Sequence, residues 1–287
     1  MMYGDVTQIT AKNESVEAAN GVRYAYRRYG NTGTSALPLV FFQHYRGNID
    51  NWDPILVDAI AEQREVILLD NKGVGGSTEE VPSTVGEMAV DAIAFTDALR
   101  LRSYDLHGFS MGGFVAQEVA LMRPHQVRRL VLSGTGPQGG RHMHGWVDEI
   151  REACLRDEPG ADDLLTIFFE RTETSRAKGA EYIQRIFSRT EDRDEPTDLA
   201  TRDAQLTAIG TWGIPDETRL NRLAGITQPT LVANGDNDLV VPTENTYLLG
   251  ERLRNARVSI YPDAGHGFLF QYPAEFGAEV NDFLGHL

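Results

Sequence analysis

Ser110 stands between two glycines in the stretch Gly-Phe-Ser-Met-Gly-Gly, residues 108–113. A short strand-like segment, residues 103–107, precedes it, and residues 114–122 carry apolar side chains at helical spacing. Gly-x-Ser-x-Gly at a strand-to-helix turn is typical of a nucleophile elbow, in which the glycines leave room for a strained serine backbone. The positive end of the following helix would favour a negative charge beside the serine. We therefore interpret Ser110 as a nucleophile, against the alternative of an ordinary glycine-rich loop.

Two later stretches contain the residue types that would activate a serine. Residues 235–242 read Gly-Asp-Asn-Asp-Leu-Val-Val-Pro, and residues 263–268 read Asp-Ala-Gly-His-Gly-Phe. A serine hydroxyl is a weak nucleophile and needs an adjacent base, which His266 would supply near neutral pH. The base needs a carboxylate on its other ring nitrogen to fix its tautomer and orientation. The residue types alone leave Asp236 and Asp238 both open for that role.

The elements that must position these residues follow from the hydrophobic pattern. An Asn-Gly pair at residues 20–21 predicts a hairpin whose two strands lie at a sheet edge. Buried strands are predicted at residues 38–42, 65–70, 103–107, 128–133, 229–234 and 258–261. Helices are predicted at residues 52–63, 84–101 (capped by Ser83), 114–122, 243–253 and after Pro273. This alternation predicts an α/β fold with a mostly parallel central sheet flanked by helices.

The alternation stops at residues 134–137 and resumes at residue 229. Only helix-like segments lie between, at residues 144–156, 164–169, 177–188 and 199–209. The sequence therefore predicts a core made of residues 1–135 and 229–287, with residues 136–228 inserted as a helical cap. Because open parallel sheets place their sites at the carboxyl ends of the strands, we expect the site under this cap.

The order serine, acid, histidine resembles that of the α/β-hydrolase fold family. Residues 71–77 also resemble the family's D-x-R-G-x-G-x-S loop, with Lys72 in place of its arginine. The resemblance is greatest to the capped serine esterase and cofactor-free haloperoxidase (perhydrolase-like) branch. It covers about residues 20–135 and 229–287, whereas the insertion matches only in length and helical character. The family pattern places the acid three residues after the glycine and four before the proline, which implies Asp238 and leaves Asp236 as a turn former.

The resemblance also implies where an oxyanion would be bound. Residues 43–52 occupy the place of the family's His-Gly-x loop, and counting back from Trp52 puts His44 at the usual glycine. Tyr45 would then donate one backbone N–H and Met111, directly after the nucleophile, the other. A shifted alignment would make Arg46 the donor in place of Tyr45.

Aromatic residues around these motifs are candidates for the walls of an apolar pocket. The predicted substrate-binding residues are His44, Phe109, Trp146, Trp212 and Phe268. Such a pocket would suit an ester or lactone with an apolar group.

The function predicted from these residues is a serine hydrolase that forms an acyl-enzyme on Ser110. Perhydrolysis of the haloperoxidase type and C–C bond hydrolysis could use the same triad, and a non-catalytic ligand receptor on this scaffold is a further alternative. Epoxide hydrolases and haloalkane dehalogenases share the fold but have an aspartate at the elbow, so Ser110 argues against both activities.

Composition narrows the partners. The 287 residues carry a formal net charge of −15, which argues against nucleic acid or an anionic membrane and leaves a small molecule as the expected partner. Cys154 is the only cysteine, so no intrachain disulfide forms, and no histidine has a metal-ligand partner at suitable spacing. We expect no cofactor and no metal.

Residues 1–15 lack a signal-peptide pattern, which predicts a cytoplasmic protein. The oligomeric state is left open.

Overall fold

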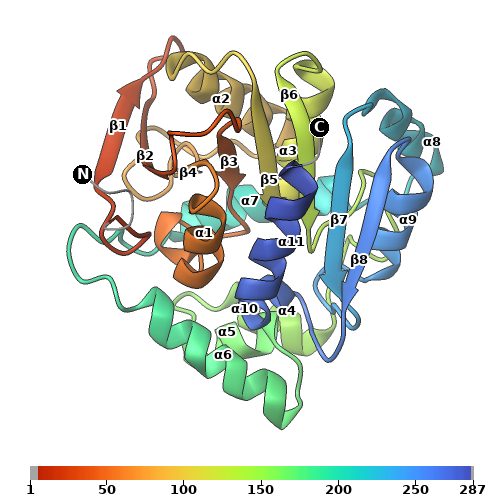
Figure 1. Ribbon diagram of the computed structural model, residues 1–287. Helices are drawn as coiled ribbons and strands as arrows, with labels where there is room; N and C mark the ends of the chain where they lie inside the picture. Colours follow the sequence, from red (N-terminus) through yellow and green to blue (C-terminus); the bar gives the residue numbers. More distant parts are fainter. Residues whose placement is uncertain (1–5, 286–287) are drawn as a thin grey trace.

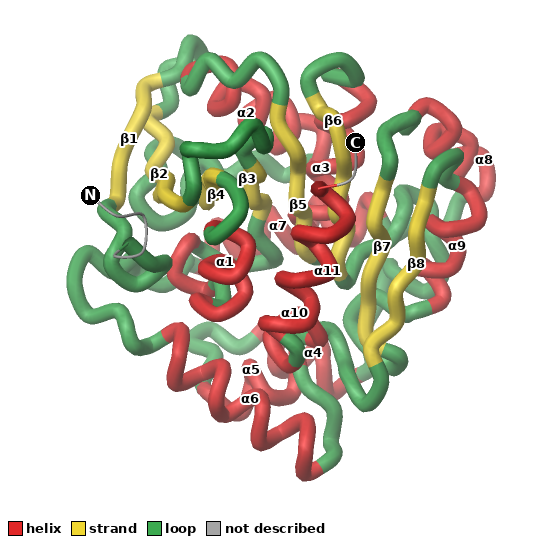
Figure 2. The backbone as a smooth tube through the Cα atoms, viewed as in Figure 1, coloured by secondary structure: helices red, strands yellow, loops and turns green. Residues whose placement is uncertain are grey.

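The computed structural model describes residues 6–285, and within them eight strands form one sheet with helices on both faces (Figures 1 and 2). The strand order is β1-β2-β4-β3-β5-β6-β7-β8. The strands are β1 (Asn13–Glu17), β2 (Arg23–Gly30), β3 (Leu39–Phe42), β4 (Glu65–Leu69), β5 (Tyr104–Phe109), β6 (Val127–Ser133), β7 (Thr230–Gly235) and β8 (Ala256–Tyr261).

The predicted hairpin is confirmed at one edge of this sheet. β1 pairs antiparallel with β2, and β2 pairs antiparallel with β4. Every further pair, from β4–β3 to β7–β8, is parallel. The predicted α/β architecture with a mostly parallel sheet is therefore confirmed, and the carboxyl ends of β3, β5, β6 and β7 lie at the same edge.

Alternating strand residues divide the core into two layers. On β3, Val40 and Phe42 join the cluster that includes residues of α2 (Val85–Ala98) and α3 (Met111–Met122). Leu39 and Phe41 join the opposite cluster, which includes residues of α1 (Pro54–Ala61) and α11 (Pro273–Gly285). This period-2 pattern explains why the strand reads as a continuous apolar run, since helices cover both of its faces. α9 (Glu244–Arg252) packs beside β7 and β8.

The helix starts follow local capping chemistry. Pro54 opens α1 after Asp53, whose carboxylate accepts the N–H of Ile55. α2 begins one residue later than predicted, because Thr84 has the extended backbone of a cap and its side chain accepts the N–H of Glu87. The assignment of Ser83 as the cap was wrong.

The four helical segments predicted in the insertion are all helices, between β6 and β7. They are α4 (Asp148–Leu155), α5 (Ala161–Phe168), α6 (Glu173–Ile186) and α7 (Leu199–Trp212), and the unpredicted short α8 (Glu217–Leu220) follows them. Figure 1 shows α4, α5 and α6 beyond the arrowheads of β7 and β8, at the carboxyl end of the sheet. α6 packs on α10 (Phe268–Gln271), and α7 packs on α2, so the middle and the later part of the insertion contact the core.

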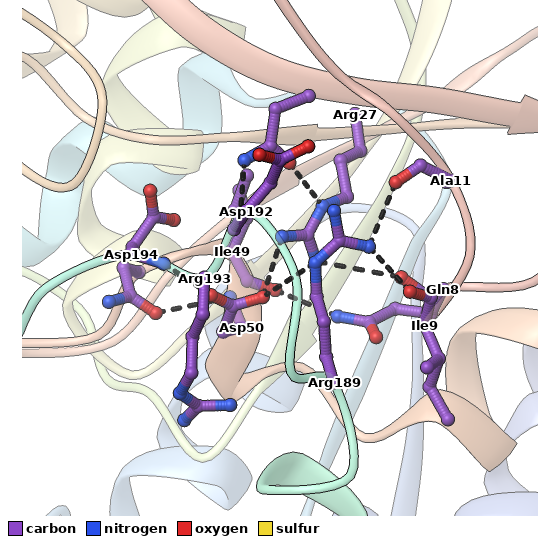
Figure 3. Close-up of polar contacts among 12 residues, drawn as sticks. Gln8, Ile9, Ala11, Arg27, Ile49, Asp50, Arg189, Asp192, Arg193 and Asp194 are labelled. Atoms are coloured by element: carbon purple, nitrogen blue, oxygen red, sulfur yellow. Dashed lines mark hydrogen bonds and ion pairs between the residues drawn. The ribbon is translucent and has the colours of Figure 1, made fainter.

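A cluster of buried charges joins the insertion to the first strands (Figure 3). Arg27 on β2 donates to Asp50 over 2.6 Å, and both side chains are almost fully buried. Arg189, after α6, donates to the carbonyl of Ala11 over 2.9 Å, and the backbone N–H of Asp194 donates to Asp50 over 2.7 Å. The chain between α6 and α7 is thus fixed by hydrogen bonds and ion pairs to the N-terminal part of the protein.

Within residues 6–285, no helix combines the length and the hydropathy needed to cross a membrane.

Candidate active site

Ser110 lies at the junction of β5 and α3 with a strained backbone. Its φ is 56° and its ψ is −121°, a region that residues with a side chain rarely adopt. The flanking glycines make this turn possible. A Cβ on Gly108 would lie 2.4 Å from the carbonyl oxygen of Gly112, and a Cβ on Gly112 would lie 2.1 Å from the carbonyl oxygen of Phe42. The arrangement is the one that the sequence predicted for a nucleophile elbow.

The structure brings the three predicted residues Ser110, His266 and Asp238 into one hydrogen-bonded chain. Nε2 of His266 is 2.9 Å from Oγ of Ser110, and Nδ1 is 2.7 Å from Oδ2 of Asp238. The other carboxylate oxygen of Asp238 accepts the N–H groups of Val240 and Val241 over 2.8 and 2.9 Å. A carboxylate only accepts, so Nδ1 carries the proton and Nε2 presents its lone pair to the serine hydroxyl. All three side chains are buried.

Asp236 does not contact His266. Its two carboxylate oxygens accept the backbone N–H groups of Asp263 and Ala264, each over 3.1 Å. These bonds fix the loop that leads into His266, which is a turn-forming role. The residue types alone left either aspartate as the partner of His266. In the structure Asp238 contacts His266, whereas Asp236 binds the backbone of the loop before it.

Three successive backbone N–H groups in the loop after β3 differ in whether they have an acceptor. The N–H of His44 donates to Oε1 of Gln43 over 2.9 Å, and the N–H of Arg46 donates to Oε1 of Gln205 over 2.7 Å. The N–H groups of Tyr45 and Met111, in contrast, have no acceptor among residues 6–285. Of the two donors weighed for this loop, the one on Tyr45 is therefore free and the one on Arg46 is engaged.

The guanidinium group of Arg46 is also engaged. It donates to the carbonyl oxygens of Arg156, Asp157 and Thr197 over 2.7, 2.9 and 3.3 Å. These carbonyls belong to the segments that follow α4 and precede α7. Arg46 therefore joins the loop after β3 to the insertion.

Two aromatic rings pack against the imidazole of His266. Phe109 lies on one side with ring centroids 5.0 Å apart, and Phe168 stacks at 5.9 Å with ring planes 8° apart. The carbonyl of Phe168 accepts the N–H of Gly267 over 2.6 Å. Phe168 was absent from the predicted site residues. Its only signal in the sequence was an aromatic side chain near the end of a predicted helix in the insertion.

A cavity of about 740 Å³ opens beside Ser110 and His266. Its walls are mostly apolar and include Phe114, Met143, Trp146, Ile167, Phe168 and Val240. Two of the predicted pocket residues, His44 and Trp146, line this cavity.

The other predicted pocket residues lie elsewhere. Phe109 is behind His266, fully buried, and Trp212 stacks on Phe114 with centroids 5.1 Å apart while its indole N–H donates to the carbonyl of Gly136. Phe268 packs against Phe276 on the α11 side of the sheet. These three side chains support the walls without lining the cavity, because each is held in the core by its own contacts.

Two side chains in the cavity wall, His44 and Cys154, have shifted pKa values. Burial lowers the pKa of His44 to about 4, with a further lowering from the nearby His266. Burial raises the pKa of the Cys154 thiol to about 12, so this cysteine is an unreactive thiol in the cavity wall. In the part of the chain that the structure describes, no three His, Cys, Asp or Glu side chains are placed to hold a metal ion.

Known proteins share this fold. The model of the alpha/beta hydrolase fold family matches residues 38–273. A solved alpha/beta hydrolase fold protein from Chitinophaga pinensis is 39% identical, covers 98% of this chain and 100% of its own, and superposes with a TM-score of 0.91. A Caulobacter protein with the provisional name carbamate hydrolase RutD is 28% identical over 81% of this chain and 85% of its own. A Mycobacterium tuberculosis protein provisionally named non-heme bromoperoxidase BpoC is 28% identical over 89% of this chain and 96% of its own. With the family match spanning most of its length, this chain belongs to the α/β hydrolase fold family.

Proposed function

We propose that this protein is a serine hydrolase that cleaves a carboxylic ester or lactone with an apolar group through an acyl-enzyme on Ser110. The observation that carries the proposal is the continuous hydrogen-bonded chain from Ser110 through His266 to Asp238 beside an apolar cavity. Hydroxyl, imidazole and carboxylate in this order form the arrangement that activates a serine for acyl transfer.

The chemistry runs in two halves. His266 accepts the Ser110 proton while the serine oxygen bonds to the substrate carbonyl carbon, and the resulting oxyanion is bound by the free N–H groups of Tyr45 and Met111. The carbonyl re-forms, the carbon–oxygen bond to the alcohol breaks, and His266 gives that alcohol its proton. Water then attacks the acyl carbon while His266 accepts one of its protons. The bond from that carbon to the Ser110 oxygen breaks, His266 returns the proton to the serine, and the carboxylic acid leaves.

The insertion acts as the cap of this site in the proposal. Residues 136–228 contribute Trp146, Ile167 and Phe168 to the cavity wall, and these apolar side chains favour an apolar acyl or alcohol group. The core, residues 1–135 and 229–287, contributes Ser110, Asp238 and His266. The absence of a cofactor, of nucleic-acid binding and of membrane binding stays a prediction, as does the cytoplasmic location.

Relatives support hydrolysis and also suggest a second outcome for the same intermediate. The names RutD and BpoC describe a carbamate hydrolase and a bromoperoxidase. Both activities are compatible with an acyl-enzyme, attacked by water in the first case and by hydrogen peroxide in the second. C–C bond hydrolysis uses the same triad as well. We favour ester or lactone hydrolysis because the mostly apolar cavity wall suits the apolar group of such a substrate, and because perhydrolysis requires hydrogen peroxide as a second substrate.

The test combines labelling with turnover. A fluorophosphonate should add one phosphonyl group to Ser110, detectable by intact-protein and peptide mass spectrometry, and Ser110→Ala should remain unlabelled. The wild type should hydrolyse esters from a panel of p-nitrophenyl esters and lactones, and Ser110→Ala should lose at least about 10³-fold in kcat/KM. Adding acetate as acyl donor, hydrogen peroxide, bromide and monochlorodimedone would reveal perhydrolysis, because the peracid formed would oxidise bromide and the dimedone would be brominated. No adduct and no turnover across the panel would favour the ligand receptor.

A further inference from the structure

Phe187 and Leu199 are apolar side chains that are exposed to solvent and also line the cavity of the proposed active site. Phe187 directly follows α6 and is 56% exposed, and Leu199 begins α7 and is 42% exposed. Single exposed apolar side chains are ordinary on protein surfaces. These two differ because they belong to the wall of the same cavity as Ser110 and His266. They therefore lie at the mouth of that cavity.

The wall between the base and the mouth is apolar along α5. Leu164, Ile167 and Phe168 all line the cavity, and their spacing of three and four residues places them on one face of the helix. Phe168 is buried and stacks on His266, whereas Leu164, about one turn earlier, is half-buried. This face of α5 thus leads from the imidazole toward solvent.

The helix α7 indicates how long the cavity is. Leu199 at its first position and Ile209 both line the cavity, and Ile209 packs against the core cluster that includes residues of α3. The stretch of helix between these two residues rises about 15 Å. A fully extended chain advances about 1.2 Å per backbone bond, so about twelve bonds span that distance. A short-chain ester would leave most of the cavity, about 740 Å³, filled with water.

Three charged side chains of the cavity wall already have protein partners. The guanidinium group of Arg46 donates to three backbone carbonyls. Asp157 pairs with Arg202 over 2.8 Å, and a carboxylate oxygen of Asp198 accepts the N–H of Thr201 over 2.7 Å. A hydrocarbon chain would leave these bonds intact, whereas a charged chain would have to compete for them. The mouth therefore suits an uncharged chain.

We propose that Phe187 and Leu199 are specificity-determining residues that bind the end of a long, unbranched, uncharged hydrocarbon chain. The substrate is an ester or lactone that carries this chain on its acyl or alcohol side, with its carbonyl at Ser110 and the chain running along α5 to the mouth. This inference rests on the proposed hydrolase function. Each methylene moved from water to an apolar wall favours binding by up to about fourfold, so a chain that reaches the mouth binds more tightly than a short one.

The test measures chain-length selectivity in two series of esters. The acyl series compares kcat/KM for p-nitrophenyl dodecanoate and p-nitrophenyl butyrate. The alcohol series compares dodecyl acetate and butyl acetate by pH-stat titration, and all four esters are kept below the concentration at which they aggregate. In at least one series the wild type should prefer the long ester by about tenfold or more. That series identifies the side of the ester that occupies the mouth.

Substitutions at the mouth should reduce this preference. Phe187→Ser and Leu199→Ser should each lower the ratio by about threefold or more, mainly through a higher KM for the long ester, because contact with the chain end contributes equally to substrate and transition-state binding. Phe187→Leu keeps apolar area and should retain most of the ratio, although it removes the ring that lies 4.5 Å from the guanidinium carbon of Arg193. Ile214→Ser is the matched control, because Ile214 is 58% exposed in the same insertion but is not among the described residues that line the cavity.

The possible failures can be told apart. Melting temperatures establish that the variants are folded. A wild-type preference below about tenfold in both series, with measurable turnover, would overturn the inference and leave the hydrolase function standing. So would a strong preference that Phe187→Ser and Leu199→Ser both retain or that Ile214→Ser loses equally, and so would a fluorophosphonate adduct on Ser110 without turnover of any of the four esters. Neither an adduct nor turnover would overturn both proposals.

Discussion

Phe168 of the insertion and His266 of the core stack with ring planes 8° apart, while the Phe168 carbonyl binds the N–H of Gly267. The insertion thus contacts the face of the proposed base directly. Removing this ring would let His266 move relative to Ser110, because one of the two surfaces that hold the imidazole would be lost. Such a change alters positioning without altering any of the three reacting groups.

The first prediction follows from this contact. Phe168→Leu keeps most of the apolar volume, so it should destabilise the fold by less than about 2 kcal/mol. It should still lower kcat/KM for p-nitrophenyl esters by about tenfold, since small displacements of a base are costly. Phe169→Leu is the matched control: both phenylalanines are equally buried and pack on Tyr182, but among the described rings only Phe168 of the two also contacts His266. Equal activities for the two variants, measured beside their melting temperatures, would contradict the positioning role.

The second prediction concerns the two aspartates of the loop after β7. Asp238→Asn should lower kcat/KM by about 10³–10⁴-fold, since an amide that donates to Nδ1 stabilises the wrong tautomer of His266. Asp236→Asn keeps one oxygen for the N–H groups of Asp263 and Ala264 and should lose less than about tenfold. Steady-state kinetics on one ester decide the matter. Comparable losses in both variants would mean that the carboxylate of Asp238 has no special role.

The third prediction concerns close backbone contact at the elbow. Gly112→Ala would place a Cβ 2.1 Å from the carbonyl oxygen of Phe42, so β3 and α3 would have to separate. We expect a loss of at least about 2 kcal/mol in the free energy of unfolding, together with loss of labelling at Ser110. Gly210→Ala on α7 meets nothing within 4 Å and should stabilise the protein by about 0.5–1 kcal/mol. Urea unfolding of the two variants measures both effects, and a stable, active Gly112→Ala protein would refute the steric argument.

The fold and the three reacting groups could be predicted because their signals are local. The buried runs of β3 and β4, the glycines around Ser110 and the spacing of Asp238 each lie within a few residues of sequence. The parallel arrangement then requires their carboxyl ends to share an edge. That constraint brings Ser110, His266 and the loop with Asp236 and Asp238 to one edge, and the resemblance to the α/β-hydrolase family then selected Asp238 over Asp236.

The walls of the cavity could not be predicted in the same way. Trp146 and Trp212 are both aromatic residues of the insertion, yet one lines the cavity and the other stacks on Phe114. Which face an inserted helix turns toward the core depends on packing between segments far apart in sequence. The same holds for Gln205, whose side chain accepts the N–H of Arg46 across 159 positions and thereby leaves Tyr45 as the free donor.

The last prediction concerns Asp70 and Asp194, two carboxyl groups that approach each other beside Gly75. Burial raises the pKa of Asp70 well above its ordinary value, the charge of Asp194 raises it further, and burial also raises the pKa of Asp194. A carboxyl with a raised pKa in the folded protein contributes stability that is present below its unfolded pKa of about 4 and is lost as pH rises through the folded value. Asp194→Asn removes one charge and supplies an N–H donor for Asp70, so the free energy of unfolding should fall less between pH 5 and pH 8, by on the order of 1 kcal/mol. Asp192→Asn, at an exposed neighbour, should follow the wild-type pH dependence. Urea unfolding at several pH values tests this, and parallel curves for wild type and Asp194→Asn would show that the two carboxyl groups do not share a proton.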